Sequence, residues 1–561
     1  MSKIVLISGH ICSGKSKLTE NLARRFAFGV VKTSDVVRSL AEQRGLSTDR
    51  ESLQALGDQL DIDTKGGWVL GAVEHKLRSA PGFNIVVDAV RISAQVERFR
   101  ERFGPKIVHV HLKASEATLE ARFEQRKKQG RESDALMTYE RANLNKTEKE
   151  VDYLEREADL AVNTDKSDPD DTYTRVAARL GLYADLAANL VDVVVGGQYG
   201  SEGKGQIAAY LAREYDVLVR VGGPNAGHSV KSLSGKYIYH HLPSGCRDSE
   251  GIVLVGPGAV INPEGIVKEI EECGLSPGRV FIDPQAMVIS PEDVLAEQTT
   301  VVTAISSTGT GTGHALARKI LHRGRKSAIT ARDYPTLTPF IGETFEQLER
   351  AFAAGKRVLL EGTQGSGLSI HHGAYPHVTS RDTNVAGCLA EAGIAPARVR
   401  KVVLVVRTYP IRVADPEPLL RALEAGGQYL VDNQDSSITG RPTSGRLKQE
   451  ISFADIAARA GLDAANVETA EITSTTKRRR RVGEFEWDQF RRACALNAPS
   501  DLAVTFADYI SAHNRDARRF EQLSVETIQW IEELERVAHA PASLVSTRFS
   551  ERAIIDRRNW S

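Results

Sequence analysis

The sequence has little cysteine, no net charge and no long apolar run, and each absence argues against a class of protein. Its five cysteines are scattered without a C-x-x-C pair, so neither a disulfide framework nor a zinc site is indicated. No stretch approaches the roughly 18 apolar residues of a membrane span, and the apolar run at residues 4–7 is too short for a signal peptide. Lys plus Arg and Asp plus Glu number 73 each, so no overall field attracts nucleic acid or a membrane. We therefore expect a cytoplasmic protein with neither as a partner.

A chain of 561 residues is longer than a domain with a single hydrophobic core usually is, so we expect more than one domain. Strand-like runs at residues 3–8, 84–88, 107–112 and 159–162 alternate with helical patterns, which predicts a parallel α/β sheet. A fresh strand begins near residue 190. We therefore predict an α/β protein of two domains, residues 1–185 and 190–561, the second again α/β.

Residues 9–16 read G-H-I-C-S-G-K-S, a complete Walker A motif between a predicted strand and a predicted helix. In such a loop, the backbone N–H groups between Gly9 and Gly14 and the ammonium of Lys15 hold the β- and γ-phosphates of a nucleoside triphosphate. The Ser16 hydroxyl is the expected ligand of Mg²⁺. The first domain is therefore predicted to bind a nucleoside triphosphate.

Two further segments, T-S-D-V-V-R at residues 33–38 and V-D-A-V-R-I-S-A-Q at 87–95, resemble motifs of nucleoside monophosphate kinases. The resemblance implies that Arg38 and Arg91 clamp the acceptor monophosphate, that Gln95 faces its base and that Asp88 orients Mg²⁺. It is nearer to deoxynucleotide kinases than to adenylate kinase, and the acceptor base stays open.

Arg122 and Arg126 lie four residues apart on one face of a predicted helix. They resemble the lid arginines that neutralise charge during phosphoryl transfer. The alternative is a solvated helix face.

A second phosphate loop is predicted at residues 196–205, G-G-Q-Y-G-S-E-G-K-G, between a strand and a helix. Its glycines let N–H groups approach an anion, and Lys204 adds a full charge, but the loop is not a Walker A motif. Together with G-G-P-N-A-G-H at residues 222–228, it resembles the signature of adenylosuccinate synthetases. Ser201 stands where that family has its catalytic aspartate. A Ser or Thr there resembles the phage-type branch, which makes 2-amino-deoxyadenylosuccinate from dGMP.

Further segments resemble motifs of the same family, and the resemblance covers essentially all of residues 190–561. They lie at residues 306–313, 360–365, 372–380, 406–413 and 475–483. The likeness is closest to the short archaeal and phage-type enzymes. It implies a ligase that moves the γ-phosphoryl of a triphosphate onto O6 of a purine and then displaces phosphate with the amine of L-aspartate.

The resemblance also assigns roles to single residues. His228, Lys204 and Ser201 would be catalytic, and Gly227 and Ser201 would be ligands of Mg²⁺. The residues expected to bind the substrate monophosphate are Asn225, Thr308, Gln364, Thr379 and, delivered across a homodimer interface, Arg323. Those expected to bind L-aspartate are Thr475, Thr476 and Arg478, whose guanidinium can hold a carboxylate bidentately. Those expected to bind the triphosphate are Gly203, Lys204, Gly205, Arg480, Asp508 and Ser546.

The phosphate donor stays open between ATP and GTP. Asp508 matches the family residue that reads guanine, but Phe506 replaces a lysine that stacks there, which puts GTP in doubt.

Ser201 decides between the alternative functions. Its hydroxyl cannot act as an effective base at neutral pH, but it is smaller than aspartate and uncharged, which leaves room for a 2-amino group on the purine. We therefore favour dGMP or GMP as the substrate. An ordinary adenylosuccinate synthetase acting on IMP or dIMP and a catalytically silent nucleotide sensor remain as alternatives.

Overall fold

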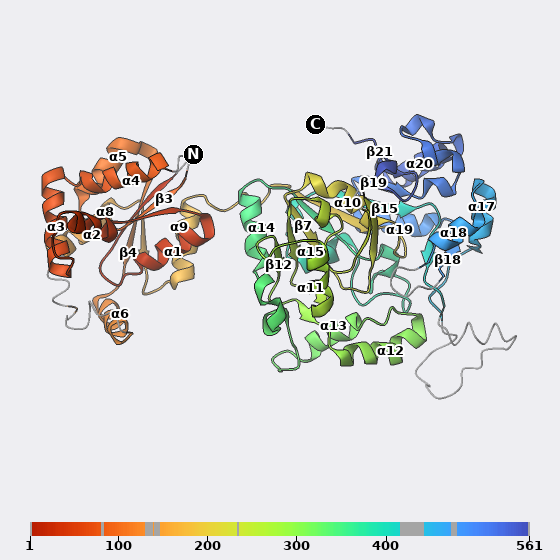
Figure 1. Cartoon of the computed structure of the whole chain (residues 1–561), viewed down its shortest axis with the longest axis horizontal. Helices are drawn as coiled ribbons and strands as arrows, with labels where there is room; N and C mark the ends of the chain where they lie inside the picture. The colour runs from red at the N-terminus through yellow and green to blue at the C-terminus, as the bar shows by residue number, and fades with distance from the viewer. Residues whose placement is uncertain are drawn as a thin grey trace. The chain divides into compact units, whose positions relative to one another are not determined.

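The computed structural model describes residues 3–79, 83–129, 139, 146–232, 235–415, 443–472 and 479–558. Contacts between Cα atoms divide the chain into two compact units, Met1–Tyr183 and Ala184–Ser561, each with its own parallel sheet (Figure 1). The predicted α/β class is confirmed in both units.

The sheet of Met1–Tyr183 has five parallel strands in the order β2-β3-β1-β4-β5. The strands are β1 (Ile4–Ser8), β2 (Gly29–Lys32), β3 (Ile85–Asp88), β4 (Ile107–Lys113) and β5 (Leu160–Asn163). Four of them match the predicted runs. The sequence did not predict β2, because its four residues G-V-V-K include a single fully buried position.

Helices flank this sheet on both faces, as the crossovers between parallel strands require. They are α1 (Lys15–Phe26), α2 (Thr33–Gln43), α3 (Arg50–Thr64), α4 (Gly67–Ser79), α5 (Ser93–Phe103), α6 (Glu116–Lys128), α8 (Lys146–Glu157) and α9 (Pro169–Arg179). Helix α3 begins at an N-cap aspartate, Asp49, whose carboxylate accepts from the backbone N–H of Ser52. The three helices α2, α3 and α4 are inserted between β2 and β3, and they pack on one another through a small apolar cluster.

The sheet of Ala184–Ser561 has nine strands in the order β12-β10-β7-β14-β6-β15-β19-β20-β21, and only the edge pair β20–β21 is antiparallel. These strands are β6 (Val191–Gly196), β7 (Val217–Arg220), β10 (Ile252–Val255), β12 (Val280–Ile282), β14 (Val358–Glu361), β15 (Val399–Arg407), β19 (Asp501–Thr505), β20 (Ala542–Ser546) and β21 (Ile554–Asp556). Short sheets surround it, formed by β8 (His228–Ser232) with β9 (Gly235–Tyr239), β11 (Val260–Ile261) with β13 (Met287–Val288), and β16 (Ile411–Arg412), β18 (Arg481–Gly483) and β17 (Glu450–Ile451).

The side chains of the central strand β6 alternate between two cores. Val191, Val193 and Val195 join one apolar cluster, and Val194 joins the other on the opposite face. The helices of this unit are α10 (Lys204–Leu211), α11 (Pro263–Glu272), α12 (Pro291–Ile305), α13 (Thr312–Leu321), α14 (Thr344–Ala353), α15 (Val385–Ala392), α17 (Phe453–Ala460), α18 (Ala464–Ala470), α19 (Trp487–Asn497) and α20 (Val525–Ala538). Helices thus cover both faces of the sheet, and the ends of its strands remain available to form a ligand site.

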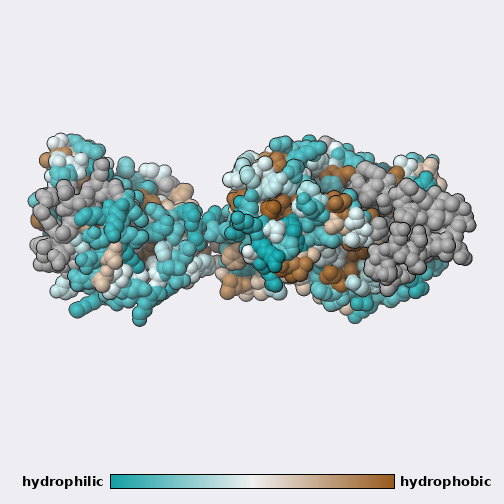
Figure 2. Space-filling view, turned by 90° about the horizontal axis from the view of Figure 1, so that it is seen from below, coloured by the Kyte–Doolittle hydropathy of each residue, from teal (hydrophilic) through white to brown (hydrophobic). Residues whose placement is uncertain are grey.

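Apolar side chains lie on the surface of this unit where α12 and α13 pack together (Figure 2). Leu295, Ile320 and Leu321 are 63%, 56% and 74% exposed. Within the part of the chain that the structure describes, no helix has both the length and the apolar character needed to cross a membrane.

Candidate active site

A cavity of about 1160 Å³ lies in Ala184–Ser561, beyond the carboxyl ends of the parallel strands. Loops that follow β6, β7, β14, β15 and β19 all contribute to its lining, as is usual for ligand sites of open α/β sheets. Of the residues expected at the site, it brings together Ser201, Gly203, Lys204, Gly205, Asn225, Gly227, His228, Thr308, Gln364, Thr379, Arg480 and Asp508.

The Gly-rich loop is held in shape by a buried carboxylate that the sequence analysis did not single out. Glu202 accepts hydrogen bonds from the backbone N–H groups of Gln198, at 3.1 Å, and Gly200, at 2.8 Å. Its other oxygen pairs with the ammonium of Lys204 in the first turn of α10, and both side chains are buried. Ser201 lies beside it with a φ of 54°, exposed to the cavity. The loop is therefore fixed by its own anion and presents Ser201.

The first turn of α10 packs directly against His228. A Cβ atom on Gly205 would lie 2.7 Å from the Cβ of His228 and 3.1 Å from the Ser244 hydroxyl oxygen. Only glycine fits at this position, so the phosphate loop and the histidine are held side by side.

His228 also has a buried carboxylate partner. Its Nδ1 lies 2.6 Å from Glu361 Oε1 at the end of β14. Glu361 further accepts from the backbone N–H and the hydroxyl of Ser244, each at 2.7 Å, and lies 3.7 Å from the guanidinium of Arg220. With Nδ1 donating to Glu361, Nε2 is the ring nitrogen left for a ligand in the cavity.

Burial, together with the charge of Arg220, lowers the pKa of His228 to about 4, against the opposing effect of Glu361. Burial alone would raise the pKa of Glu361, but His228, Arg220 and the Ser244 N–H lower it to about 2. At neutral pH the pair is therefore a neutral imidazole on an ionised carboxylate. A charge-assisted role of His228 requires that a bound phosphate first raise its pKa.

The residues expected to bind the substrate monophosphate form one polar group on the cavity wall. The Gln364 amide donates to Asn225 Oδ1 at 3.0 Å, and the Asn225 amide donates to the Thr379 hydroxyl at 3.5 Å. Thr308 lies in the same lining, with its hydroxyl oxygen 3.5 Å from that of Thr310. Segments more than 150 residues apart thus meet here, as the hydrogen bond from Asn225 to Thr379 shows.

Arg480 and Asp508 line the cavity around a third buried carboxylate, that of Glu471. Glu471 pairs with Arg480 at 2.8 Å and with the fully buried Arg407 at 2.8 Å. Arg407 in turn donates to the carbonyl of Ser201 at 3.3 Å, and its guanidinium carbon lies 4.1 Å from the centre of the Phe506 ring. The Ser201 backbone is therefore linked to Phe506 and, through Glu471, to Arg480.

Asp508 is buried, and its Oδ1 has no hydrogen-bond partner among the described residues. Burial raises the pKa of Asp508 to about 6, although Arg515, 3.7 Å away, opposes the shift. A buried oxygen without a partner is costly, so it is suited to accept from a ligand in the cavity.

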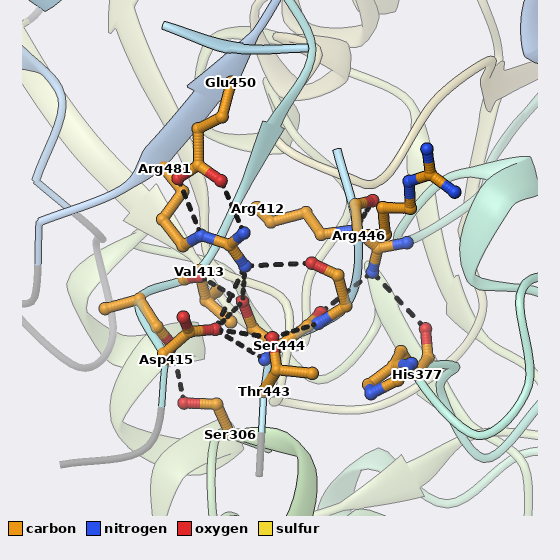
Figure 3. Close-up of polar contacts among 12 residues, drawn as sticks. Ser306, His377, Arg412, Val413, Asp415, Thr443, Ser444, Arg446, Glu450 and Arg481 are labelled. Atoms are coloured by element: carbon orange, nitrogen blue, oxygen red, sulfur yellow. Dashed lines mark hydrogen bonds and ion pairs between the residues drawn. The ribbon is translucent and has the colours of Figure 1, made fainter. Parts of the chain in front are cut away.

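Figure 3 shows a hydrogen-bond network that fixes another part of the wall. Asp415 Oδ1 accepts from the Thr443 hydroxyl at 2.8 Å, from the Ser444 N–H at 2.8 Å and from Arg481 at 3.0 Å. Arg412, which lines the cavity, donates to the Ser444 carbonyl at 3.0 Å and lies over the Tyr199 ring at 4.0 Å. This network ties β16 and β18 to the Gly-rich loop.

Some expected site residues lie elsewhere. Arg323 is exposed just after α13 and is not among the residues that line the cavity. Ser546 is buried at the end of β20, and its hydroxyl donates to the carbonyl of Arg548, which does line the cavity. Thr475, Thr476 and Arg478 lie outside the described residues.

In Met1–Tyr183, the Walker A loop takes the expected place between β1 and α1. Gly9 and Gly14 have φ values of 138° and 104°, and a Cβ on Gly9 would lie 2.2 Å from the Leu112 carbonyl oxygen. Lys15 donates to the carbonyls of Gly9 and His10 at 2.6 and 2.7 Å, while Ser16 is exposed at the start of α1. Asp88 pairs in register with Ile7, directly before the loop.

Of the other residues expected in this unit, Arg122 lies closest to the loop. It donates to the Thr164 hydroxyl at 2.9 Å and to the Cys12 carbonyl at 3.5 Å. Arg126 is half-buried one turn further along α6, Arg38 is exposed on α2, and Arg91 is half-buried just after β3.

Gln95, which the sequence predicts to face the acceptor base, instead makes its side-chain hydrogen bonds inside the protein. It is buried, its amide oxygen accepts from the Arg91 N–H at 2.9 Å, and its amide nitrogen donates to Asp61 Oδ1 at 2.8 Å.

The fold and the site define an α/β nucleotide enzyme with two phosphate loops, of which only the first is a Walker A loop. Comparison with family models identifies both parts. A model described as adenylosuccinate synthetase matches residues 193–334 and 326–515, more than half of the chain, and one described as an AAA domain matches residues 5–150. The chain belongs to the adenylosuccinate synthetase family. It is a ligase with an additional N-terminal, kinase-like P-loop domain, and the resemblance seen in the sequence is confirmed.

Relatives and solved structures agree with this assignment. The adenylosuccinate synthetase of Pyrococcus horikoshii is 32% identical over 375 residues, which are 65% of this chain and 98% of the relative, and that of Methanocaldococcus jannaschii is 30% identical over 376 residues, 65% and 96%. The succinoaminodeoxyadenylate synthetase (PurZ) of cyanophage S-2L, solved with dGMP and with dATP as energy donor, is 27% identical with a TM-score of 0.51, covering 66% of this chain and 96% of its own. The fully ligated enzyme of Plasmodium falciparum, 19% identical with a TM-score of 0.54 over 66% and 100% of the two chains, shares the fold.

Proposed function

We propose that Ala184–Ser561 joins L-aspartate to C6 of a 6-oxopurine monophosphate, with dGMP or GMP favoured, and so forms an N6-succino-2-amino-(deoxy)adenylate. The observation that carries this proposal is Ser201, exposed to the cavity that Lys204 and His228 also line. The similar phage enzyme was solved with dGMP, which supports the same substrate class here.

The reaction has two steps in this proposal. The γ-phosphoryl group moves from the triphosphate to O6 as the N1 proton passes to water, and the amine of aspartate then attacks C6, gives up a proton to water and displaces phosphate. Lys204 and the N–H groups of Gly203 and Gly205 would hold the triphosphate at the start of α10. His228 Nε2 would donate to the transferred phosphoryl group once the phosphate charge has raised its pKa, with Glu361 stabilising the imidazolium.

The remaining residues bind and orient in this proposal. Asn225, Thr308, Gln364 and Thr379 would hold the substrate monophosphate, and Thr475, Thr476 and Arg478 would grip aspartate. Arg480 would contact the triphosphate, and Ser546 would act through the turn that carries Arg548. The donor would be ATP or GTP, with Asp508 accepting from its base. Phe506, in place of the family's lysine, weakens the case for GTP.

Mg²⁺ fits the oxygen donors that both units offer. Mg²⁺ prefers hard oxygen ligands and usually takes only one or two from the protein beside the phosphates. Ser16 in the first unit, and Ser201 with the carbonyl of Gly227 in the second, would provide them. When bound, the ion neutralises phosphate charge.

For Met1–Tyr183 we propose phosphorylation of a nucleoside monophosphate, with the triphosphate on the Walker A loop. Arg38 and Arg91 would clamp the acceptor phosphate, Asp88 would orient Mg²⁺, and Arg122 and Arg126 would neutralise the transferring group. The contact of Arg122 with Cys12 of the loop supports its role.

We also propose that the chain forms a homodimer through the apolar surface of α12 and α13. Arg323 is exposed two residues beyond Leu321 on this surface. It would reach the substrate site of the second copy, which explains why it does not line the cavity of its own chain.

A substrate panel tests the synthetase proposal. With L-aspartate, Mg²⁺ and ATP or GTP, we expect dGMP or GMP to be converted to the succino-2-aminopurine nucleotide, detected by mass spectrometry. If IMP or dIMP has a kcat/KM at least tenfold higher, about 1.4 kcal/mol in the barrier, the enzyme is an ordinary adenylosuccinate synthetase. If no purine monophosphate is converted although all bind, the unit is a nucleotide sensor.

Glu361→Gln tests the role given to His228. The amide can still contact the imidazole but no longer stabilises its charged form, so we expect kcat to fall about tenfold at pH 7 with little change in the KM for aspartate. The alkaline limb of the pH–kcat profile should move to lower pH, because loss of the anion lowers the pKa of His228, which acts in its protonated form. Glu269→Gln is a matched control, since Glu269 pairs with the buried His241 at 3.1 Å outside the cavity lining. An unchanged profile in Glu361→Gln would contradict the proposed role.

A further inference from the structure

A carboxylate in Met1–Tyr183 has one oxygen fully engaged and the other open. Asp61, on α3, accepts at Oδ1 from the Trp68 indole N–H at 2.6 Å and from the Gln95 amide at 2.8 Å. Among the described residues, the donors that bind this carboxylate both contact Oδ1 and not Oδ2, and the residue is only half-buried. The two bonds fix the direction of the carboxylate, so Oδ2 is a positioned acceptor.

The place of Asp61 connects it to the expected acceptor site. Gln95, which binds Asp61, also accepts from the backbone N–H of Arg91, the residue proposed to clamp the acceptor phosphate. Burial raises the pKa of Asp61, although the hydrogen bonds from Trp68 and Gln95 and the charge of Arg91 oppose the shift. A monophosphate held by Arg91 therefore has its base in reach of the region where α3, α4 and α5 meet.

Gln95 itself is poorly suited to read a base. Its oxygen and its nitrogen are both used inside the protein, and a Cβ on Gly66 would lie 2.9 Å from its backbone nitrogen, so the side chain is closely enclosed. It acts as a positioning residue, and the group that faces outward is the Oδ2 atom of Asp61.

We propose that Asp61 reads the base of the acceptor monophosphate and selects a purine with a 2-amino group. A carboxylate oxygen accepts only, so a 2-amino group placed against Oδ2 gains a hydrogen bond that a hydrogen at C2 does not make. The choice of the 2-amino group rests on the proposed synthetase function, since that group is present in both its substrate and its product. The two units then act on one class of purine.

The test measures diphosphate formation by mass spectrometry with the full chain, ATP and Mg²⁺, leaving out L-aspartate so that the synthetase makes no succinylated product. Two substrate pairs differ only in the 2-amino group, dGMP with dIMP and 2-amino-dAMP with dAMP. We expect the wild type to prefer the 2-amino member of each pair by about tenfold or more in kcat/KM. Asp61→Asn keeps an acceptor oxygen for Trp68 and Gln95 but replaces Oδ2 with a donor, so both preferences should fall to about threefold or less.

Trp68→Phe is the matched control, because it removes one bond to Oδ1 and leaves Oδ2 unchanged. It should lower activity on all four substrates together and keep the preference. A preference below threefold in the wild type, or one that survives in Asp61→Asn, would overturn the inference. Absence of phosphorylation of all four substrates by the wild type would instead refute the kinase proposal.

Discussion

Lys204→Ala is expected to lower aspartate condensation by about 10³-fold and to leave monophosphate phosphorylation near its wild-type value, and Lys15→Ala is expected to do the reverse. Each lysine starts the helix after its own phosphate loop, in a unit with its own sheet and core. Removing the ammonium takes away a positive charge beside the triphosphate in that unit alone. Condensation is measured as succinylated nucleotide and phosphorylation as diphosphate, each by mass spectrometry.

Substituting Lys204 and substituting Lys15 affect different neighbouring groups, and the choice of control variants follows from this difference. Lys204→Ala leaves the buried Glu202 without its cation, which costs stability, whereas Lys15 donates to the carbonyl oxygens of Gly9 and His10. Lys204→Gln is therefore the second variant, since its amide can still donate to Glu202 without carrying charge. If either lysine variant, folded by thermal melting, loses both activities, the model of two independent triphosphate sites is wrong.

Ser201→Asp is expected to lower activity on guanine nucleotides by about 10²-fold, while activity on IMP stays constant or rises. The added carboxylate supplies a base for the N1 proton and a ligand for Mg²⁺, but it also brings bulk and charge beside C2 of the purine. Guanine carries its amino group at C2 and hypoxanthine only hydrogen, so the two substrates respond in opposite directions. The ratio of kcat/KM for dGMP and IMP is the measurement.

The backbone at Ser201 suits this exchange. Its φ of 54° lies in the left-handed region, where aspartate is tolerated better than most side chains, and the Arg407 guanidinium donates to the Ser201 carbonyl at 3.3 Å. Ser201→Ala controls for loss of the hydroxyl alone. If Ser201→Asp keeps full activity on dGMP and gains none on IMP, the choice of purine is made elsewhere in the cavity.

The sequence predicted those parts of the fold and site that are encoded locally. Most strands of the first unit stand out as short apolar runs, and phosphate loops are contiguous because several consecutive N–H groups must surround one anion. The strand β2 has no such signal, since only one of its four residues is fully buried.

The partners of the site residues could not be predicted in this way. Glu361 lies 133 residues from His228 and meets it only because β14 and β7 are adjacent in the sheet. Gln95 fits a sequence motif, yet Asp61 on another helix holds its amide, and no local pattern indicates that contact. Likewise, nothing in the sequence near Ser546 shows that its hydroxyl turns back to the Arg548 carbonyl.

The carboxylate of Glu202 makes the second phosphate loop a weak site for simple anions. It occupies the N–H groups of Gln198 and Gly200 and neutralises Lys204, so a small anion such as free phosphate or sulfate gains little by entering the second loop. Inhibition of the ligase by the phosphate that it releases during turnover should therefore be weak.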